Sequence, residues 1–125
     1  MEVLIRQYLT AYNAKDVPGM LALLHDVIVF ENVSGSNGIT ATSGKIEFEA
    51  LALQSLSVFS SRRQIIRSLT LGERTAAAEI EFEGVLAVSG LKTGANDAKA
   101  ETLQLRGVTV FAFSDGKIVR ISDYS

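Results

Sequence analysis

The chain has 125 residues, of which 47% are apolar and 21% charged, and it contains ten Gly, one Pro and no Cys. Without Cys, a disulfide scaffold, a thiolate metal site and a cysteine nucleophile are excluded. Twelve Lys and Arg against fourteen Asp and Glu argue against a protein dedicated to binding nucleic acid.

Two helices are predicted at the start of the chain. Residues 2–14 carry their apolar side chains at helical spacing, with Tyr8 and Tyr12 on one stripe. Asp16 is a suitable N-cap for a second, short helix, because Pro18 follows in its first turn. Residues 27–30 are β-branched and aromatic, which predicts a strand.

The rest of the chain is predicted to contain one more helix and then only strands. Residues 34–43 are rich in Gly, Ser and Thr and predict a polar loop. A third helix is expected over residues 45–59, with Ile46 and Leu53 on its broad apolar face. Strands are expected over 64–71, 75–88, 100–113 and 118–124, with a loop at 90–99 and a hairpin turn at 114–117. Strands that follow helices predict an α+β fold, with the helices on one face of a mainly antiparallel sheet.

The chain carries the sequence YLTAYNAKD at residues 8–16, a strand ending at Asn32, a DGK turn and a terminal Ser-Asp-Tyr. With the element order, these features resemble the nuclear transport factor 2-like superfamily over essentially the whole chain. The superfamily includes ketosteroid isomerase, limonene epoxide hydrolase and the SnoaL-like polyketide cyclases. Residues 8–16 and the strand ending at Asn32 are similar to the opening of ketosteroid isomerase. The resemblance implies one SnoaL-like domain over residues 1–125. It also implies a cone-shaped, cystatin-like roll, in which three N-terminal helices and a strongly curved sheet enclose a deep apolar pocket.

The resemblance also assigns faces to the strands. If Tyr8 and Asn32 face the pocket, the other inward residues follow, because side chains two apart on a strand share a face. Val119 falls on this inward face too. The residues expected to line the pocket are Tyr12, Phe30, Ile80, Phe82, Leu105, Thr109, Phe111 and Ile121.

Asp123 is the one acidic residue that this alternation leaves facing inward. A carboxyl group in an apolar cavity has a raised pKa, which suits general acid/base catalysis near neutral pH. Limonene epoxide hydrolases and SnoaL-like cyclases carry a catalytic Asp at the matching place. The alternative is that Asp123 only caps the strand or pairs with a helix residue.

Tyr8 and Asn32 are the other two candidate catalytic residues. Tyr8 matches the tyrosine that donates to the oxyanion in ketosteroid isomerase; the alternative is a core tyrosine whose hydroxyl is satisfied locally. Asn32 and Thr109 stand where that enzyme has two carboxyl groups, which argues against steroid isomerisation. Asn32 is expected to orient substrate or water. Ile80 and Phe82 replace the Arg-x-Asp pair of limonene epoxide hydrolase, so epoxide hydrolysis is not supported.

The remaining charged residues are expected on the surface. Glu79, Glu81 and Glu83 alternate on the outer face, where Arg106 and Arg120 are expected to pair with them. His25 is the only His, and we expect it to be a helix-end residue rather than a metal ligand. We expect no metal and no cofactor.

Two functions stay open. The preferred one is a pocket for a small lipophilic molecule, with Asp123 as acid/base of an isomerase, cyclase or hydrolase acting on a carbonyl-type substrate. The other is a non-catalytic ligand-binding or dimerisation module of the same fold. We expect a homodimer through the outer sheet face, because Val108, Val110 and Ala112 point outward there.

We expect the protein in the cytoplasm, with neither nucleic acid nor membrane as partner. Met1-Glu2-Val3 lacks the basic start of a targeting segment. No apolar run reaches the roughly 18 residues of a membrane span.

Overall fold

The computed structural model describes residues 1–35, 38–87 and 101–125. Its helices are α1 (Glu2–Asn13), α2 (Val17–Ala22) and α3 (Gly44–Ser55). Its strands are β1 (Leu24–Ser34), β2 (Gly38–Ser43), β3 (Phe59–Leu71), β4 (Thr75–Leu86), β5 (Thr102–Ser114) and β6 (Lys117–Tyr124). None of the helices in these residues is long and apolar enough to span a membrane.

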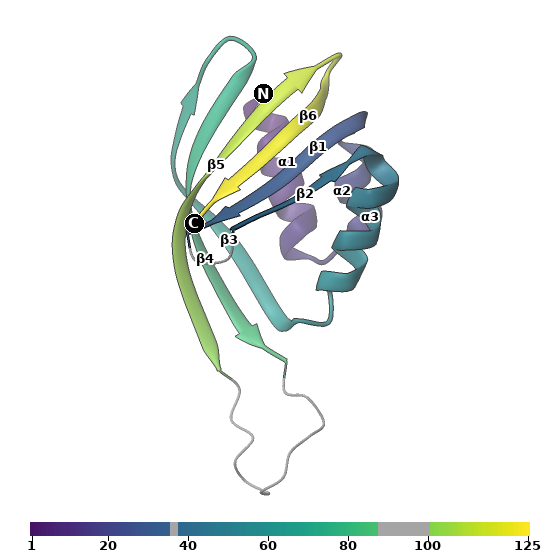
Figure 1. The fold of residues 1–125 in the computed structure, drawn as a ribbon. Helices are drawn as coiled ribbons and strands as arrows, with labels where there is room; N and C mark the ends of the chain where they lie inside the picture. Colours follow the sequence, from purple (N-terminus) through teal and green to yellow (C-terminus); the bar gives the residue numbers. More distant parts are fainter. Residues whose placement is uncertain (36–37, 88–100) are drawn as a thin grey trace, which may run out of the picture.

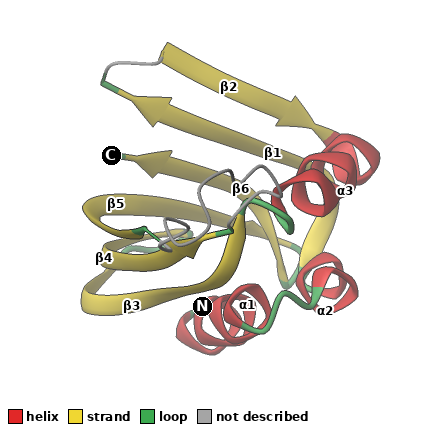
Figure 2. Ribbon diagram, turned by 90° about the horizontal axis from the view of Figure 1, so that it is seen from below, coloured by secondary structure: helices red, strands yellow, loops and turns green. Residues whose placement is uncertain are grey.

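The strands form one curved sheet in the order β2-β1-β6-β5-β4-β3. The pairing is antiparallel throughout, except that β1 and β6 run parallel. Figures 1 and 2 show the three helices gathered on one side of this sheet. The predicted α+β fold is confirmed, and β3 to β6 form the predicted antiparallel meander.

The prediction of a polar loop is wrong for the second half of that segment, which forms strand β2. Its sequence GITATS contains three β-branched residues, Ile39, Thr40 and Thr42, and it pairs with β1 from Val29 to Ser34. Ser34 belongs to β1 rather than to a loop. The loop predicted at 90–99, with Val88 and Ala100 beside it, lies outside the described residues.

Helix α3 is shorter than predicted and its apolar face is narrower. It ends at Ser55, and the Nζ of Lys15 donates to the carbonyl of Leu56, just beyond the helix, at 3.2 Å. The prediction placed Ile46 and Leu53 inward, but they are 85% and 52% exposed. Only one side of the helix meets the sheet, where the ring of Phe48 packs edge-on against Phe30 at 5.7 Å between centroids.

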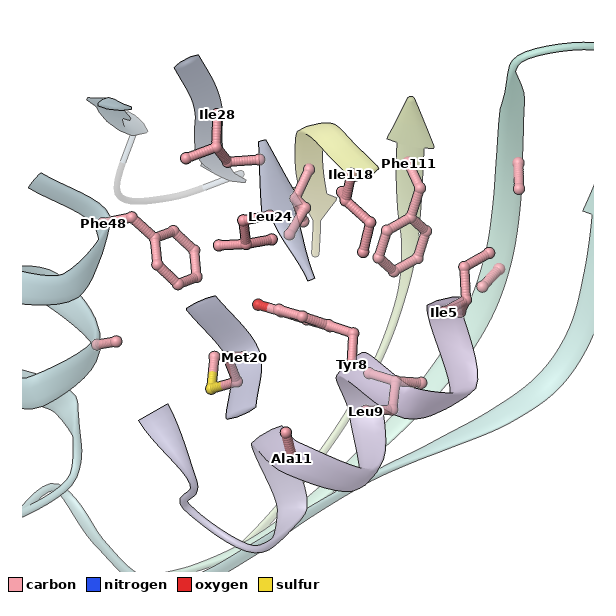
Figure 3. Packing of buried hydrophobic residues seen from close by; sticks show 14 of the residues in the cluster. Ile5, Tyr8, Leu9, Ala11, Met20, Leu24, Ile28, Phe48, Phe111 and Ile118 are labelled. Carbon is pink, nitrogen blue, oxygen red and sulfur yellow. The ribbon is translucent and has the colours of Figure 1, made fainter. Parts of the chain in front are cut away.

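The core lies between the three helices and the inner face of the sheet (Figure 3). Its largest fully buried side chains are Phe111, Ile5, Leu24, Ile28, Ile118 and Ile121. Val119 was predicted on this face, and this is wrong. A bulge between β5 and β6 pairs Phe113 with Ile118 and Ala112 with Arg120, so Val119 is the extra residue.

The predicted helix cap at Asp16 and the predicted hairpin turn at 114–117 both have the expected local geometry. The carboxylate of Asp16 accepts a hydrogen bond from the Gly19 amide at 3.0 Å and so caps α2. Asp115 and Gly116 both have positive φ, as the tight hairpin between β5 and β6 requires. This hairpin sets the register of β6, which carries Asp123.

Gly107 of β5 lies against the end of β6. A Cβ atom added there would lie 2.3 Å from the carbonyl oxygen of Tyr124, so the backbone would have to move. We expect Gly107→Ala to lower the free energy of unfolding by about 1–3 kcal/mol, as measured by urea denaturation. Gly35→Ala is the control, because nothing lies within 4 Å of its added Cβ. Equal stability of the two variants would contradict this packing.

Candidate functional site

Strand register places four polar residues in one row across the inner face of the sheet. Asn32 of β1 pairs with Thr40 of β2 on one side and with Asp123 of β6 on the other. Asp123 pairs in turn with Thr109 of β5. All four side chains line a cavity of about 360 Å³, which is within the size range of small-molecule sites.

Apolar side chains surround this polar row. The neighbouring row of the sheet pairs Phe30 with Ile121 and Ile121 with Phe111, and all three line the same cavity. The helices supply most of the opposite wall: Tyr8, Tyr12, Met20, Phe48, Leu51, Ala52 and Ser55. The polar row therefore faces mostly apolar surroundings.

A hydrogen bond from β5 holds Asp123 inside the cavity. The Thr109 hydroxyl donates to Oδ1 of Asp123 at 2.6 Å. Burial raises the pKa of the Asp123 carboxyl because water is removed from its charged form, and the Thr109 hydrogen bond opposes this rise. A raised pKa brings the group closer to neutral pH, where it can both accept and return a proton.

Tyr8 brings a neutral hydroxyl into the same cavity from α1. The residue is 5% exposed, and its ring packs edge-on against Phe111. Burial raises the pKa of Tyr8 well above its usual value, the charge of Asp123 adds to the rise, and Arg62 opposes it. Figure 3 shows the hydroxyl projecting away from α1 into the space beside Phe48 and Leu24. Tyr8 is therefore a hydrogen-bond donor that keeps its proton at neutral pH.

The predicted residues line two adjoining cavities. The larger one is lined by Tyr8, Tyr12, Phe30, Asn32, Thr109, Phe111, Ile121 and Asp123. Ile80, Phe82 and Leu105 line a second cavity of about 240 Å³. The two cavities share Tyr12, Asn32, Thr109 and Asp123, so they meet along the polar row. Phe59 also lines both, and its ring packs against Phe82 at 5.2 Å between centroids.

Arg62 and Gln64 of β3 line the larger cavity, and sequence reasoning missed both. The predicted strand began only at residue 64, so Arg62 was not given a face. Their alternation with Ile66, which packs against the core, was the available signal. The Asn13 side chain fixes this part of β3 through both backbone groups of Gln64, at 2.8 and 3.2 Å.

The acidic stripe on β4 faces outward as predicted, but its predicted partners are wrong. Glu83 pairs with Arg63 at 3.2 Å, and Glu81 pairs with Arg67; both arginines lie on β3 rather than on β5 or β6. Glu79 accepts a hydrogen bond from Ser68. Arg63 lies directly opposite Glu83 in the β3–β4 ladder, whereas Arg67 is the extra residue of a bulge between Ile66 and Ser68.

Arg120 and His25 pair with acidic residues outside the β4 stripe. Arg120 pairs with Glu31 of β1 at 3.0 Å. His25 Nε2 lies 3.1 Å from Asp115 in the hairpin turn. Over residues 1–35, 38–87 and 101–125, no three His, Asp or Glu side chains are grouped as a metal ion would require.

Because the pKa of Asp123 is raised in the folded protein, the free energy of unfolding should depend on pH. Between the pKa of the unfolded chain and that of the folded protein, the folded state binds the extra proton, so stability falls as pH rises through this window. We therefore expect Asp123→Asn to be more stable than the wild type at pH 7. The difference should close below about pH 4, where both states are protonated.

Thermal or urea unfolding across this pH range measures the effect. Asp26→Asn is the matched control, because the Asp26 side chain is 90% exposed. A stability gain in Asp123→Asn that is the same at pH 3 and pH 7 would contradict burial as the cause.

Comparison with known proteins identifies the family. A family model described as the SnoaL-like domain matches residues 5–121. A candidate polyketide cyclase from Pseudomonas putida KT2440 is 26% identical, with a TM-score of 0.74 over 98% of this chain and 88% of that one. A second candidate polyketide cyclase, from Xanthomonas campestris pv. campestris, is 24% identical, with a TM-score of 0.73 over 99% and 88% of the chains.

Similarity of fold extends to a protein with a different named activity. An LEH-like epoxide hydrolase from M. tuberculosis has a TM-score of 0.75 at 18% identity, over 97% of this chain and 78% of that one. At this identity the likeness shows the fold alone. No curated protein matches the sequence significantly. The match over residues 5–121 is sufficient to show that the chain belongs to the SnoaL-like domain family.

Proposed function

We propose that this protein binds a small, largely apolar carbonyl compound in the larger cavity and that Asp123 moves a proton to and from it. The observation that carries the proposal is a carboxyl group in mostly apolar surroundings, held by the Thr109 hydroxyl alone among the described side chains. The candidate polyketide cyclases of the same fold favour carbonyl chemistry over other reactions.

The proposed reaction is proton transfer at the carbon next to a carbonyl. The Asp123 carboxylate takes the proton, and the electrons of the C–H bond form the C=C bond of an enolate. The Tyr8 hydroxyl donates a hydrogen bond to the enolate oxygen, and apolar surroundings strengthen that bond. Asp123 then returns the proton to carbon or to an oxygen of the product. Asn32, beside Asp123 in the row, orients the substrate or a water molecule.

Deuterium exchange tests this step without knowledge of the natural substrate. Incubated in D2O with 2-tetralone, the wild type should speed exchange of the protons beside the carbonyl above the buffer rate, as followed by NMR. Asp123→Asn should lose this acceleration by at least about 100-fold, because no base remains. Tyr8→Phe should lose about 100-fold, because the enolate donor is missing.

Asp26→Asn is the control, because its carboxyl group is exposed and should leave exchange unchanged. An unchanged rate in Asp123→Asn would overturn the catalytic role. Binding of 2-tetralone without any acceleration by the wild type would instead favour the alternative function, a non-catalytic ligand-binding module. One observation favours that alternative: Asp123 is the only carboxyl group among the described residues that line the cavity.

We further propose that two copies of the chain associate through the outer face of β5. Val108 is 38% exposed there, and Val110 and Ala112 are partly exposed. Ion pairs of β3–β4 and β1–β6 flank this apolar strip. A second copy would cover the strip and leave the charges at its rim.

Sedimentation measures this association. We expect the wild type at twice the chain mass of 13.4 kDa, and Val108→Glu at the chain mass, since the new charge would be buried without a partner. Val3→Glu is the control, because Val3 is 67% exposed on α1, away from the sheet face. A wild type that sediments as a single chain would contradict the proposal.

A further inference from the structure

Arg62 is a buried cation in the wall of the larger cavity. The residue is only 7% exposed, although arginine is among the residues most rarely buried. Its Nε and Nη2 atoms donate to the carbonyl oxygen of Tyr12 at 3.2 and 3.1 Å. Its guanidinium also lies over the Tyr12 ring, with Cζ 3.7 Å from the ring centroid. These contacts fix the position of the group against the end of α1.

The contacts of Arg62 leave its charge without an acidic partner. Within residues 1–35, 38–87 and 101–125, no carboxylate oxygen lies within 4.0 Å of its nitrogens, whereas exposed Arg63, Arg67 and Arg120 are all paired. The guanidinium has five N–H groups, and two of them are used on the Tyr12 carbonyl. A further, long hydrogen bond of 3.5 Å runs from Nη1 to the Ser55 hydroxyl.

A buried charge without a counter-ion is costly for a folded protein. Tyr12 supplies a carbonyl dipole and a ring face, which reduce this cost but add no negative charge. Arg62 lines the larger cavity, and its hydrogen bonds to Tyr12 and Ser55 among the described residues use three of its five N–H groups. Such a group is suited to an anion that arrives with a ligand.

Asp123 does not serve as this counter-ion. The pKa of Asp123 is raised by burial and is not held down by Arg62. Burial raises the pKa values of Tyr8 and Tyr12, and the charge of Asp123 adds to the rise while that of Arg62 opposes it. The cation stands on β3 and the carboxyl group on β6, with β4 and β5 between these strands in the sheet, and the two tyrosines of α1 line the same cavity.

We propose that Arg62 binds a carboxylate of the ligand, so that the substrate is a small apolar carbonyl acid with its carboxylate at β3 and its reacting carbon near Asp123. This rests on the ligand-binding part of the proposed function and names its substrate class. A guanidinium and a carboxylate can form two parallel hydrogen bonds, which fix the orientation of the ligand and also pair the two charges. The ligand's charge would neutralise Arg62 without displacing its bonds to Tyr12.

A matched pair of probes tests the inference on the wild-type protein. 2-Naphthoate and 2-naphthamide share one apolar body and differ in charge at neutral pH. We expect the wild type to bind 2-naphthoate at least tenfold more tightly than 2-naphthamide, by calorimetric titration. Equal affinities, or no binding of 2-naphthoate, would overturn the inference.

Variants of Arg62 separate a ligand contact from a purely structural role. Arg62→Gln should lose at least tenfold in affinity for 2-naphthoate and little for 2-naphthamide, since only the charged probe needs the cation. Arg62→Lys keeps the charge and should retain a reduced preference for 2-naphthoate. If the Gln variant does not fold, this reduced preference tests whether Arg62 contacts the carboxylate, and an unchanged preference would contradict it. Arg63→Gln is the control, because Arg63 is exposed and paired with Glu83. A preference that survives in Arg62→Gln would contradict the assignment.

The outcome is distinguishable from failure of the acid/base proposal. A tenfold preference for 2-naphthoate that depends on Arg62, together with no deuterium exchange into 2-tetralone, would keep the Arg62 site and reject catalysis by Asp123. Exchange that depends on Asp123, with equal binding of the two naphthalene probes, would keep catalysis and reject the Arg62 site.

Discussion

The site depends on the in-register pairing of β1, β6 and β5 around Asp123. The ladder sets Asn32 on one side of Asp123 and Thr109 on the other, with all three side chains on the inner face. A slip of one residue in β6 would turn Asp123 outward and bring in Ser122, which now bonds Glu31 on the outer face. The DGK hairpin, the bulge at Val119 and the close approach at Gly107 all act on this register.

The same cavity holds two ionisable groups that the described part of the protein leaves incompletely partnered. Asp123 has the hydroxyl of Thr109, and Arg62 has the carbonyl and ring of Tyr12. Apolar replacements would pack there at lower cost in desolvation. Local rules for a stable core are most often broken at functional sites, where a ligand completes the missing contacts. Two such groups in one cavity are the basis of the proposal that the site orients its ligand.

Side-chain periodicity was sufficient to predict the helices and the meander. The inward faces of Tyr8 and Asn32 came from the family resemblance, and alternation along the strands extended them to Asp123. It failed where structure depends on a neighbour rather than on local pattern. Strand β2 has the composition of a loop, and it becomes a strand because the edge of β1 accepts its hydrogen bonds. Arginine is a residue type expected on the surface, yet Arg62 is buried because the end of α1 lies over it. Ile46 and Leu53 fit an apolar helix face, yet the sheet reaches only the other side of α3.

The most direct test of this account is the pKa of the Asp123 carboxyl group, measured by a carbon-detected NMR titration of the folded, ligand-free protein. The register places this group in a mostly apolar cavity, so its pKa should lie above the value of about 3.9 typical of an exposed Asp. A pKa at or below that value would mean that the Asp123 carboxyl is well solvated or paired with a cation. Either result would contradict its role as the acid/base group of the cavity.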